Sequence, residues 1–345
     1  MIFKPYYQKT DNWISYIKNS NQLMIKVFLS QNPYAVQYLE HYDNENENDL
    51  KNNFLNNDLI LWSHLSSNEN AIHLLNCNLN KIDWLELSYN ENAIHILKRF
   101  TNNGNFLFWK DMSWNPKAIS LLEKNIDKIN WYALSGNINA ITLLEKYPQK
   151  INWTNLSGNI NGISILEKNI DKINWYQLSK NPNAISILEN HIDKIDWYQL
   201  SKNPNAISIL EQHINKIDWS NLSLNPNAIH LLEQHINKID WSNLSLNPNA
   251  IHLLEKYPEN INWCNLSSNL NAISLLEKNL DKINWIEMAR NFNSMHLFFK
   301  LNKTKMMKQN QEFLKELNEY IFNPLRITRL SNIYNIDEWI YLESI

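Results

Sequence analysis

The sequence predicts an all-α protein, an α-solenoid of short helix–turn–helix repeats. Three observations lead to this fold class. Tryptophan recurs at intervals of 22 residues, Asn-Pro dipeptides recur at the same step, and the apolar residues between them follow a helical period. A single repeat is too short to bury an apolar face alone, so neighbouring repeats must stack into one continuous core.

Tryptophan sets the register of the repeat. The interval is 22 residues except before Trp109, where it is 25, and the stretch 99–105 reads as a lengthened loop. We therefore expect an apolar spine from about residue 59 to 300, with roughly eleven to twelve units extending on the order of 100 Å. Eleven of the fourteen tryptophans share this repeat position: Trp62, Trp84, Trp109, Trp131, Trp153, Trp175, Trp197, Trp219, Trp241, Trp263 and Trp285.

The unit 218–239, DWSNLSLNPNAIHLLEQHINKI, shows how one repeat is predicted to fold. Its first residue, an aspartate, caps a first helix of roughly 7 residues that places Trp219 and Leu222 on one face. Asn225 and Pro226 begin a second helix of roughly 12 residues, because Asn accepts from an unpaired N–H and proline suits the first helical position. The apolar stripe of that second helix is Ile229, Leu232, Ile236 and Ile239.

A leucine-rich-repeat-like horseshoe is the alternative fold. The spacing of Trp219, Leu222, Leu224 and Asn227 imitates LxxLxLxxN, and 22 residues lies within that family's range. The pattern departs at the second Leu of the LxL pair, which a horseshoe must bury. Leucine stands there only at positions 224 and 246, and elsewhere the position holds Tyr89, Gly136, Gly158, Lys180, Lys202 or Ser268. Charged and small residues at this position favour the helical solenoid.

Three regions follow from where the repeat begins and ends. Residues 1–58 are expected to form an N-terminal cap with one degenerate unit, 29–36, and an acidic Asn-rich loop, 43–49. Residues 59–300 form the tandem repeat array. Residues 301–345 form a helical C-terminal tail, in which apolar residues from Phe313 to Ile321 follow a helical spacing.

No repeated polar residue predicts an active site. Copies of one repeat position stack about 8–10 Å apart, whereas zinc ligands must lie about 2.0–2.1 Å from one ion. The serine of each Leu-Ser pair has neither a Gly elbow nor a recurrent His–Asp pair nearby, which favours side-chain-to-backbone bonding in a turn. We therefore expect no catalytic residue, no cofactor, no metal and no enzymatic activity. The repeated residues that could serve as ligands are His191, His213 and His235 at one position, His230 and His252 at another, and the glutamate column Glu123, Glu145, Glu167, Glu189, Glu211, Glu233, Glu255 and Glu277.

The candidate binding residues are those that change between otherwise near-identical units. Scaffold positions stay fixed while these vary, which is how a repeat array adapts a binding surface, although drift after duplication gives a similar pattern. The predicted partner-binding residues are Tyr176, Lys180, Tyr198, Lys202, Leu224 and Leu246.

Charge and composition bound the compartment and the partners. The formal net charge is −3 with no basic block, which argues against nucleic acid as the partner. No GxGxxG or GxxxxGK[ST] motif occurs among four glycines, which argues against nucleotide-binding loops of those kinds. No run of 18 apolar residues and no signal-like start occurs, and Cys77 and Cys264 are isolated. We expect a soluble, unsecreted protein with no membrane partner.

The repeat Trp-x-x-Leu-Ser-x-Asn-Pro-Asn-Ala-Ile resembles the short tandem-repeat proteins of mimivirus-like giant DNA viruses. The likeness covers about 240 residues, and the segment 319–337 is similar to a C-terminal segment of such proteins. The resemblance implies a viral protein in the cytoplasm of an infected host cell or in the virion, and it carries no catalytic residue.

The functional expectation combines the array with this resemblance. Long solenoid surfaces suit extended peptides or protein edges. We expect a non-enzymatic protein–protein interaction scaffold or adaptor with a host or viral protein partner. The alternative is a self-associating structural component of the virion or virus factory.

Overall fold

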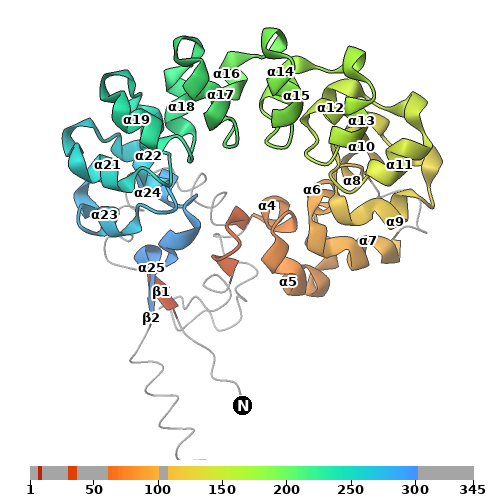
Figure 1. Cartoon of the computed structure of the whole chain (residues 1–345). Coiled ribbons are helices and arrows are strands. Elements are labelled where there is room, and N and C mark those ends of the chain that lie inside the picture. The colour runs from red at the N-terminus through yellow and green to blue at the C-terminus, as the bar shows by residue number, and fades with distance from the viewer. Residues whose placement is uncertain (1–6, 10–29, 37–60, 101–107, 302–345) are drawn as a thin grey trace, which may run out of the picture.

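The computed structural model describes residues 7–9, 30–36, 61–100 and 108–301 of the chain. Within them the chain forms an α-solenoid of helix–turn–helix units that bends into a ring (Figure 1). All regular elements between residues 61 and 298 of this described part are helical. The horseshoe alternative, which requires a strand in every repeat, is therefore wrong.

The first helix of each unit begins at the repeated tryptophan. In all of these units except those of Trp62 and Trp109, the Asn or Asp before the tryptophan caps the helix. The Asp218 carboxylate, for example, accepts from the backbone N–H of Asn221 at 2.8 Å, as predicted from the sequence. These first helices are α4 (Trp62–Ser66), α6 (Trp84–Tyr89), α8 (Trp109–Met112), α10 (Trp131–Gly136), α12 (Trp153–Gly158), α14 (Trp175–Ser179), α16 (Trp197–Leu200), α18 (Trp219–Leu224), α20 (Trp241–Leu244), α22 (Trp263–Ser267) and α24 (Trp285–Met288).

The second helix of each unit follows the turn that begins at the buried asparagine, with the sequence Asn-Pro-Asn in four units. These second helices are α5 (Ile72–Cys77), α7 (Ile94–Phe100), α9 (Ile119–Leu122), α11 (Ile141–Lys146), α13 (Ile163–Glu167), α15 (Ile185–Glu189), α17 (Ile207–Gln212), α19 (Ile229–Gln234), α21 (Ile251–Lys256), α23 (Ile273–Glu277) and α25 (Met295–Phe298). Short 3₁₀ turns lead into some of them: η3 (Glu69–Ala71), η5 (Glu91–Ala93), η7 (Pro116–Ala118) and η16 (Phe292–Ser294).

The predicted single second helix of roughly 12 residues is wrong. In the unit 218–239 the helix α19 ends at Gln234, and His235 leaves the helical region with φ −130° and ψ 48°. The backbone then continues as a separate 3₁₀ turn. In two units a proline follows this residue and disfavours helix before it. The 3₁₀ turns at this position are η4 (Leu79–Lys81), η8 (Ile126–Lys128), η9 (Pro148–Lys150), η10 (Ile170–Lys172), η11 (Ile192–Lys194), η12 (Ile214–Lys216), η13 (Ile236–Lys238), η14 (Pro258–Asn260) and η15 (Leu280–Lys282).

One apolar core runs through the array, which confirms the predicted spine. Each unit contributes the same buried set, exemplified by Leu222, Ala228 and Leu232, all with 0% of their surface exposed. The repeated tryptophans pack against this core only partly, and among those described Trp285 alone is buried. Tryptophan thus covers the edge of the core, while leucine and alanine fill its centre.

A column of buried asparagines joins each unit to the preceding one. The Asn203 Nδ2 donates to the carbonyl oxygens of Ser179 and Asn181 in the previous unit, both at 3.0 Å. Its Oδ1 accepts from the backbone N–H of Asn205 at 3.0 Å, which fixes the turn. Buried polar atoms are costly without partners, and this side chain is fully used. The twelve described members of the buried asparagine column are Asn32, Asn68, Asn90, Asn115, Asn137, Asn159, Asn181, Asn203, Asn225, Asn247, Asn269 and Asn291.

The serine of each Leu-Ser pair is also structural. The Ser179 hydroxyl donates to the carbonyl oxygen of Trp175 at 2.8 Å and accepts from the backbone N–H of Asp196 at 2.9 Å. Asp196 is the cap of the next first helix, so one buried hydroxyl links two successive units. The prediction of side-chain-to-backbone bonding is confirmed, and it extends across the unit boundary.

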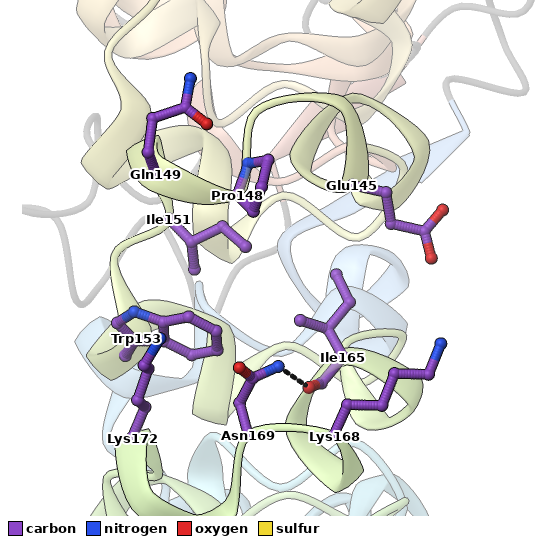
Figure 2. Close-up of a pocket in the computed structure, with 9 residues that line it drawn as sticks. All are labelled: Glu145, Pro148, Gln149, Ile151, Trp153, Ile165, Lys168, Asn169 and Lys172. Atoms are coloured by element: carbon purple, nitrogen blue, oxygen red, sulfur yellow. Dashed lines mark hydrogen bonds between the residues drawn. The ribbon is translucent and has the colours of Figure 1, made fainter.

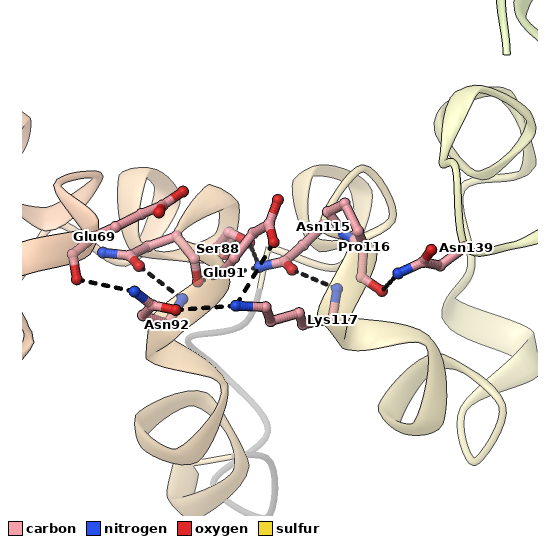
Figure 3. A network of polar contacts seen from close by, with 9 residues as sticks. Glu69, Ser88, Glu91, Asn92, Asn115, Pro116, Lys117 and Asn139 are labelled. Atoms are coloured by element: carbon pink, nitrogen blue, oxygen red, sulfur yellow. Dashed lines mark hydrogen bonds and ion pairs between the residues drawn. The ribbon is translucent and has the colours of Figure 1, made fainter. Parts of the chain in front are cut away.

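An exposed column of asparagines runs along the edge of the array. Asn139 Nδ2 donates to the carbonyl oxygen of Pro116 at 3.0 Å, and Asn92 Nδ2 donates to that of Glu69 at 3.2 Å (Figure 3). In one unit lysine replaces this asparagine. Lys117 Nζ bonds Asn92 Oδ1 at 3.0 Å and lies 3.8 Å from a carboxylate oxygen of Glu91. The edge position therefore tolerates exchange of its polar group.

The curvature comes from unequal spacing of the two helix rows. Successive first helices contact one another, as α10 and α12 do, whereas each second helix packs mainly within its own unit. In Figure 1 the second helices α5, α9, α11 and α23 lie on the outer side of the arc, whereas α15 and α17 are drawn nearer its centre than α14 and α16. Closer packing of one row than the other bends a stack of repeats.

The array closes on itself, a curvature that the sequence left open. Residues 30–36, the degenerate first unit, lie against the last unit (Figure 1). Asn32 Nδ2 approaches the carbonyl oxygen of Ala289 at 3.5 Å, and the rings of Tyr34 and Phe292 are 6.3 Å apart. The consistent bend of every unit accumulates until the two ends meet, which helix spacing alone could not indicate.

A short strand pair adds to the closure. Strand β1 (Tyr7–Lys9) pairs antiparallel with β2 (Phe299–Leu301), with Gln8 opposite Lys300. The rest of the predicted N-terminal cap, including the acidic loop 43–49, and the predicted tail after residue 301 lie outside the described residues.

Candidate interaction surface

Two neighbouring first helices present the same exposed pair of side chains. Tyr176 lies on α14 and Lys180, four residues later, caps the C-terminal end of that helix, while Tyr198 lies on α16 and Lys202 follows its C-terminal end. The two tyrosines are 49% and 51% exposed. The Lys180 and Lys202 ammonium groups lie 5.6 and 5.1 Å from their own tyrosine ring centroids. We call these four residues the Tyr/Lys surface.

The two leucines predicted as binding residues occupy the lysine position in the next two units. Leu246, which follows α20, is 38% exposed, while Leu224 at the end of α18 is half-buried. The structure thus brings all six residues onto one row of consecutive first helices. Their role in binding stays a prediction.

Sequence comparison of near-identical units missed three further aromatic residues on this row. Tyr132 is 57% exposed, and its ring meets Trp114 edge-on at 6.4 Å. Tyr89 is 43% exposed and donates its hydroxyl to Asp111 Oδ1 at 2.6 Å. All three stand in the two variable positions of earlier, more divergent units. Listing every residue at those positions would have found them.

The Tyr89 hydroxyl is held as a donor. Its hydrogen bond to Asp111 raises the pKa of Tyr89 to about 12, with burial and the charges of Asp111 and Glu86 acting in the same direction. Loss of the proton would leave a phenolate against a carboxylate. The hydroxyl therefore stays protonated well above neutral pH.

The repeated histidines are spread along the array. His191, His213 and His235 each pack beside the tryptophan of their own unit, with ring centroids 4.9 to 5.1 Å apart. His230 contacts Gln234, and His252 Nε2 lies 3.1 Å from Glu233 Oε1. Among the described residues no three His, Cys, Asp or Glu side chains gather as a metal site.

A shallow pocket of about 360 Å³ lies between two successive units (Figure 2). Its floor is apolar, with Ile151, Ile165 and Trp153, and Lys172 stands 4.8 Å over the Trp153 ring. Asn169 uses its Nδ2 on the carbonyl oxygen of Ile165 at 2.8 Å. The pocket is the gap left where second helices splay apart, and it holds no paired acid, base or nucleophile.

Free thiols and membrane segments add no further site. Cys77 and Cys264 are exposed and unbridged. In the part of the chain that the structure describes, no helix is both long and apolar enough to cross a bilayer. In comparison with known proteins, the chain matches no family model, and no curated protein or solved structure shows significant similarity to it.

Proposed function

We propose that this protein is a non-enzymatic interaction scaffold or adaptor, and that it binds a partner polypeptide along the row of first helices. The observation that carries the proposal is the Tyr/Lys surface: identical, exposed pairs on adjacent units of a framework that buried asparagines and serines hold together. Exposed aromatic rings with few rotatable bonds are favoured in binding surfaces.

The charge of this surface indicates the chemistry of the partner. Among the described residues no carboxylate forms an ion pair with Lys180 or Lys202, whose recorded contacts are the two tyrosine rings. Both ammonium groups are exposed and open to a carboxylate from outside. The partner we propose is therefore acidic.

The spacing of the units indicates an extended partner. Adjacent packed helices lie about 8–10 Å apart, and three residues of a polyproline II segment span about 9 Å. An acidic residue at every third position would thus meet successive lysines. The tyrosine rings would receive the proline or apolar residues between them.

The resemblance of the repeats to giant-virus tandem-repeat proteins supports a proposal about where the scaffold acts. We propose that it acts in an infected host cell, with a host or viral protein as partner. Self-association into a structural component is the competing function. Concentration-dependent sedimentation of the full chain separates that function from a monomeric adaptor.

A binding assay tests the proposal with a defined probe. A fluorescein-labelled peptide of four Glu-Pro-Ala triplets is titrated with the full chain and followed by fluorescence anisotropy, beside a peptide in which lysine replaces glutamate. Lys180→Glu with Lys202→Glu should weaken binding of the acidic peptide at least about tenfold, or about 1.4 kcal/mol. Tyr176→Ala with Tyr198→Ala should weaken it to a similar degree.

The matched control reverses two exposed lysines on adjacent second helices. Lys124→Glu with Lys146→Glu makes the same change in net charge away from the Tyr/Lys surface. It should alter the affinity less than about twofold, since separated exposed charges are screened at physiological salt. Equal losses in both double variants, or equal binding of the lysine peptide, would exclude the proposed surface.

A further inference from the structure

The junction that closes the ring differs from every internal junction in its chemistry. We call this junction, between residues 30–36 and residues 289–295, the seam. The seam uses the same column positions as the internal junctions, as shown by Asn32, whose Nδ2 turns towards the last unit. The seam and the internal junctions therefore differ in the side chains at equivalent positions, and each seam contact has an internal counterpart.

The buried asparagine bond is weakest at the seam. Asn32 Nδ2 lies 3.5 Å from the carbonyl oxygen of Ala289 and 3.9 Å from the Met295 sulfur. Well-formed N–H···O bonds measure about 2.7–3.2 Å, and a thioether sulfur is a poor acceptor. In each of the eleven internal junctions the equivalent asparagine makes at least one carbonyl bond of 3.0 Å or less.

Two further columns lose their polar groups at the seam. Ala289 occupies the position of the buried serine, so the last unit has no hydroxyl to receive the N–H of a neighbouring helix cap. Tyr34 occupies the position of the edge asparagine, and Phe292 that of the proline. Their exposed rings, 54% and 41% accessible, meet at 6.3 Å where internal units have a hydrogen bond.

The strand pair β1–β2 lies beside the seam. It extends over three residues on each side, and two-stranded pairs of such length are marginal by themselves. By the contacts of the described residues, the seam is thus the junction that loses the least free energy on separation.

We propose that the ring opens and recloses at the seam while the eleven internal junctions stay packed. In a repeat array each interface contributes its own free energy, so the weakest interface separates first. The opening is inferred from the seam contacts alone and does not depend on a partner.

Distance measurements on the full chain test the opening. Spin labels are attached at Gln31→Cys and Arg290→Cys, which flank the seam at the variable position of each unit, in a chain with both native cysteines changed to serine. Lys180→Cys with Lys202→Cys places labels at the same repeat position across an internal junction. All four positions are exposed, so labelling leaves the buried columns intact.

Double electron–electron resonance should then show two populations for the seam pair and one for the internal pair. The long-distance population should grow in urea well below the midpoint of global unfolding. Tyr34→Ala, which removes the exposed aromatic contact, should increase the long-distance population of the seam pair at least about threefold and leave the internal pair unchanged.

Three outcomes would overturn the proposal. The seam pair could keep a single short distance up to global unfolding, or both pairs could lengthen together. A long distance that vanishes on dilution would show exchange of ends between two molecules instead of opening within one. Failure of the peptide assay would leave this result untouched, since no partner is present in the distance measurement.

Discussion

At the residue scale, two asparagines of the same Asn-Pro-Asn motif have unlike roles. The Asn203 side chain is 1% exposed and donates to two carbonyl oxygens of the preceding unit. The Asn205 side chain is exposed and donates to one, that of Pro182, at 3.0 Å, and the equivalent bond from Asn227 in the next unit measures 2.9 Å. Both positions hold asparagine. Burial decides how much the hydrogen bonds of each asparagine contribute to the free energy of unfolding, because water can replace a lost partner only at the exposed site.

This difference predicts unequal costs for the same substitution. Asn203→Ala removes the Asn203 donor from the buried carbonyl oxygen of Ser179, one of two donors from that of Asn181, and the acceptor of the Asn205 N–H. It should lower the free energy of unfolding by about 3 kcal/mol. Asn205→Ala, two residues away and exposed, should lower it by less than about 1 kcal/mol. Urea unfolding followed by circular dichroism measures both. Losses of similar size would show that the buried column carries no special weight.

At the element scale, the sequence predicts where helices begin better than where they end. Caps such as Asp218 act through a local bond to a following N–H, which a motif reveals. The end of the second helix depends on competition. The Asn169 side chain, for example, bonds the carbonyl oxygen of Ile165 at 2.8 Å, where a continued helix would place its own N–H.

Neighbouring units also decide what a helix end tolerates. Gly136 and Gly158 end α10 and α12 at the same repeat position, and neither has a left-handed backbone. A Cβ at Gly158 would meet only Gln177, at 3.5 Å, whereas at Gly136 it would overlap the Trp114 ring. The neighbouring tryptophan requires the glycine in one unit and not in the other.

Matched Gly→Ala variants should therefore diverge. Gly158→Ala should raise the free energy of unfolding by up to about 1 kcal/mol through helix propensity. Gly136→Ala should give little or no gain, because the Trp114 ring must leave its contact with Tyr132. In a double-mutant cycle, Gly136→Ala in a Trp114→Ala background should recover the gain. Equal stabilisation by both single variants would contradict the assigned contact.

At the scale of the whole molecule, closure depends on the number of units. Twelve units in the described part share the turn of one ring, an average of about 30° each. An array of eleven units would need about 33° each to bring the same ends together. Packed interfaces between near-identical units have little room to take up this difference, since buried helices pack densely.

Deletion of residues 197–218, one complete unit, should therefore open the seam. The distance between spin labels at Gln31→Cys and Arg290→Cys should lengthen in most molecules, while the remaining units keep their helical circular dichroism. The control replaces residues 197–218 with the sequence of residues 219–240, which preserves the number of units and should keep the ends in contact. Unchanged label distances in the deletion variant would show that closure does not depend on unit number.

The sequence alone determined the repeat, its register and its all-α class, because these depend on local signals: capping side chains, helical spacing and the 22-residue interval. It also indicated the row that carries Tyr176, Lys180, Tyr198 and Lys202, since variable positions in a repeat share one face. Only the tertiary structure decided that the array closes. The bend of each unit is a small difference between two rows of packing contacts, and it accumulates over the array until Asn32 meets Ala289.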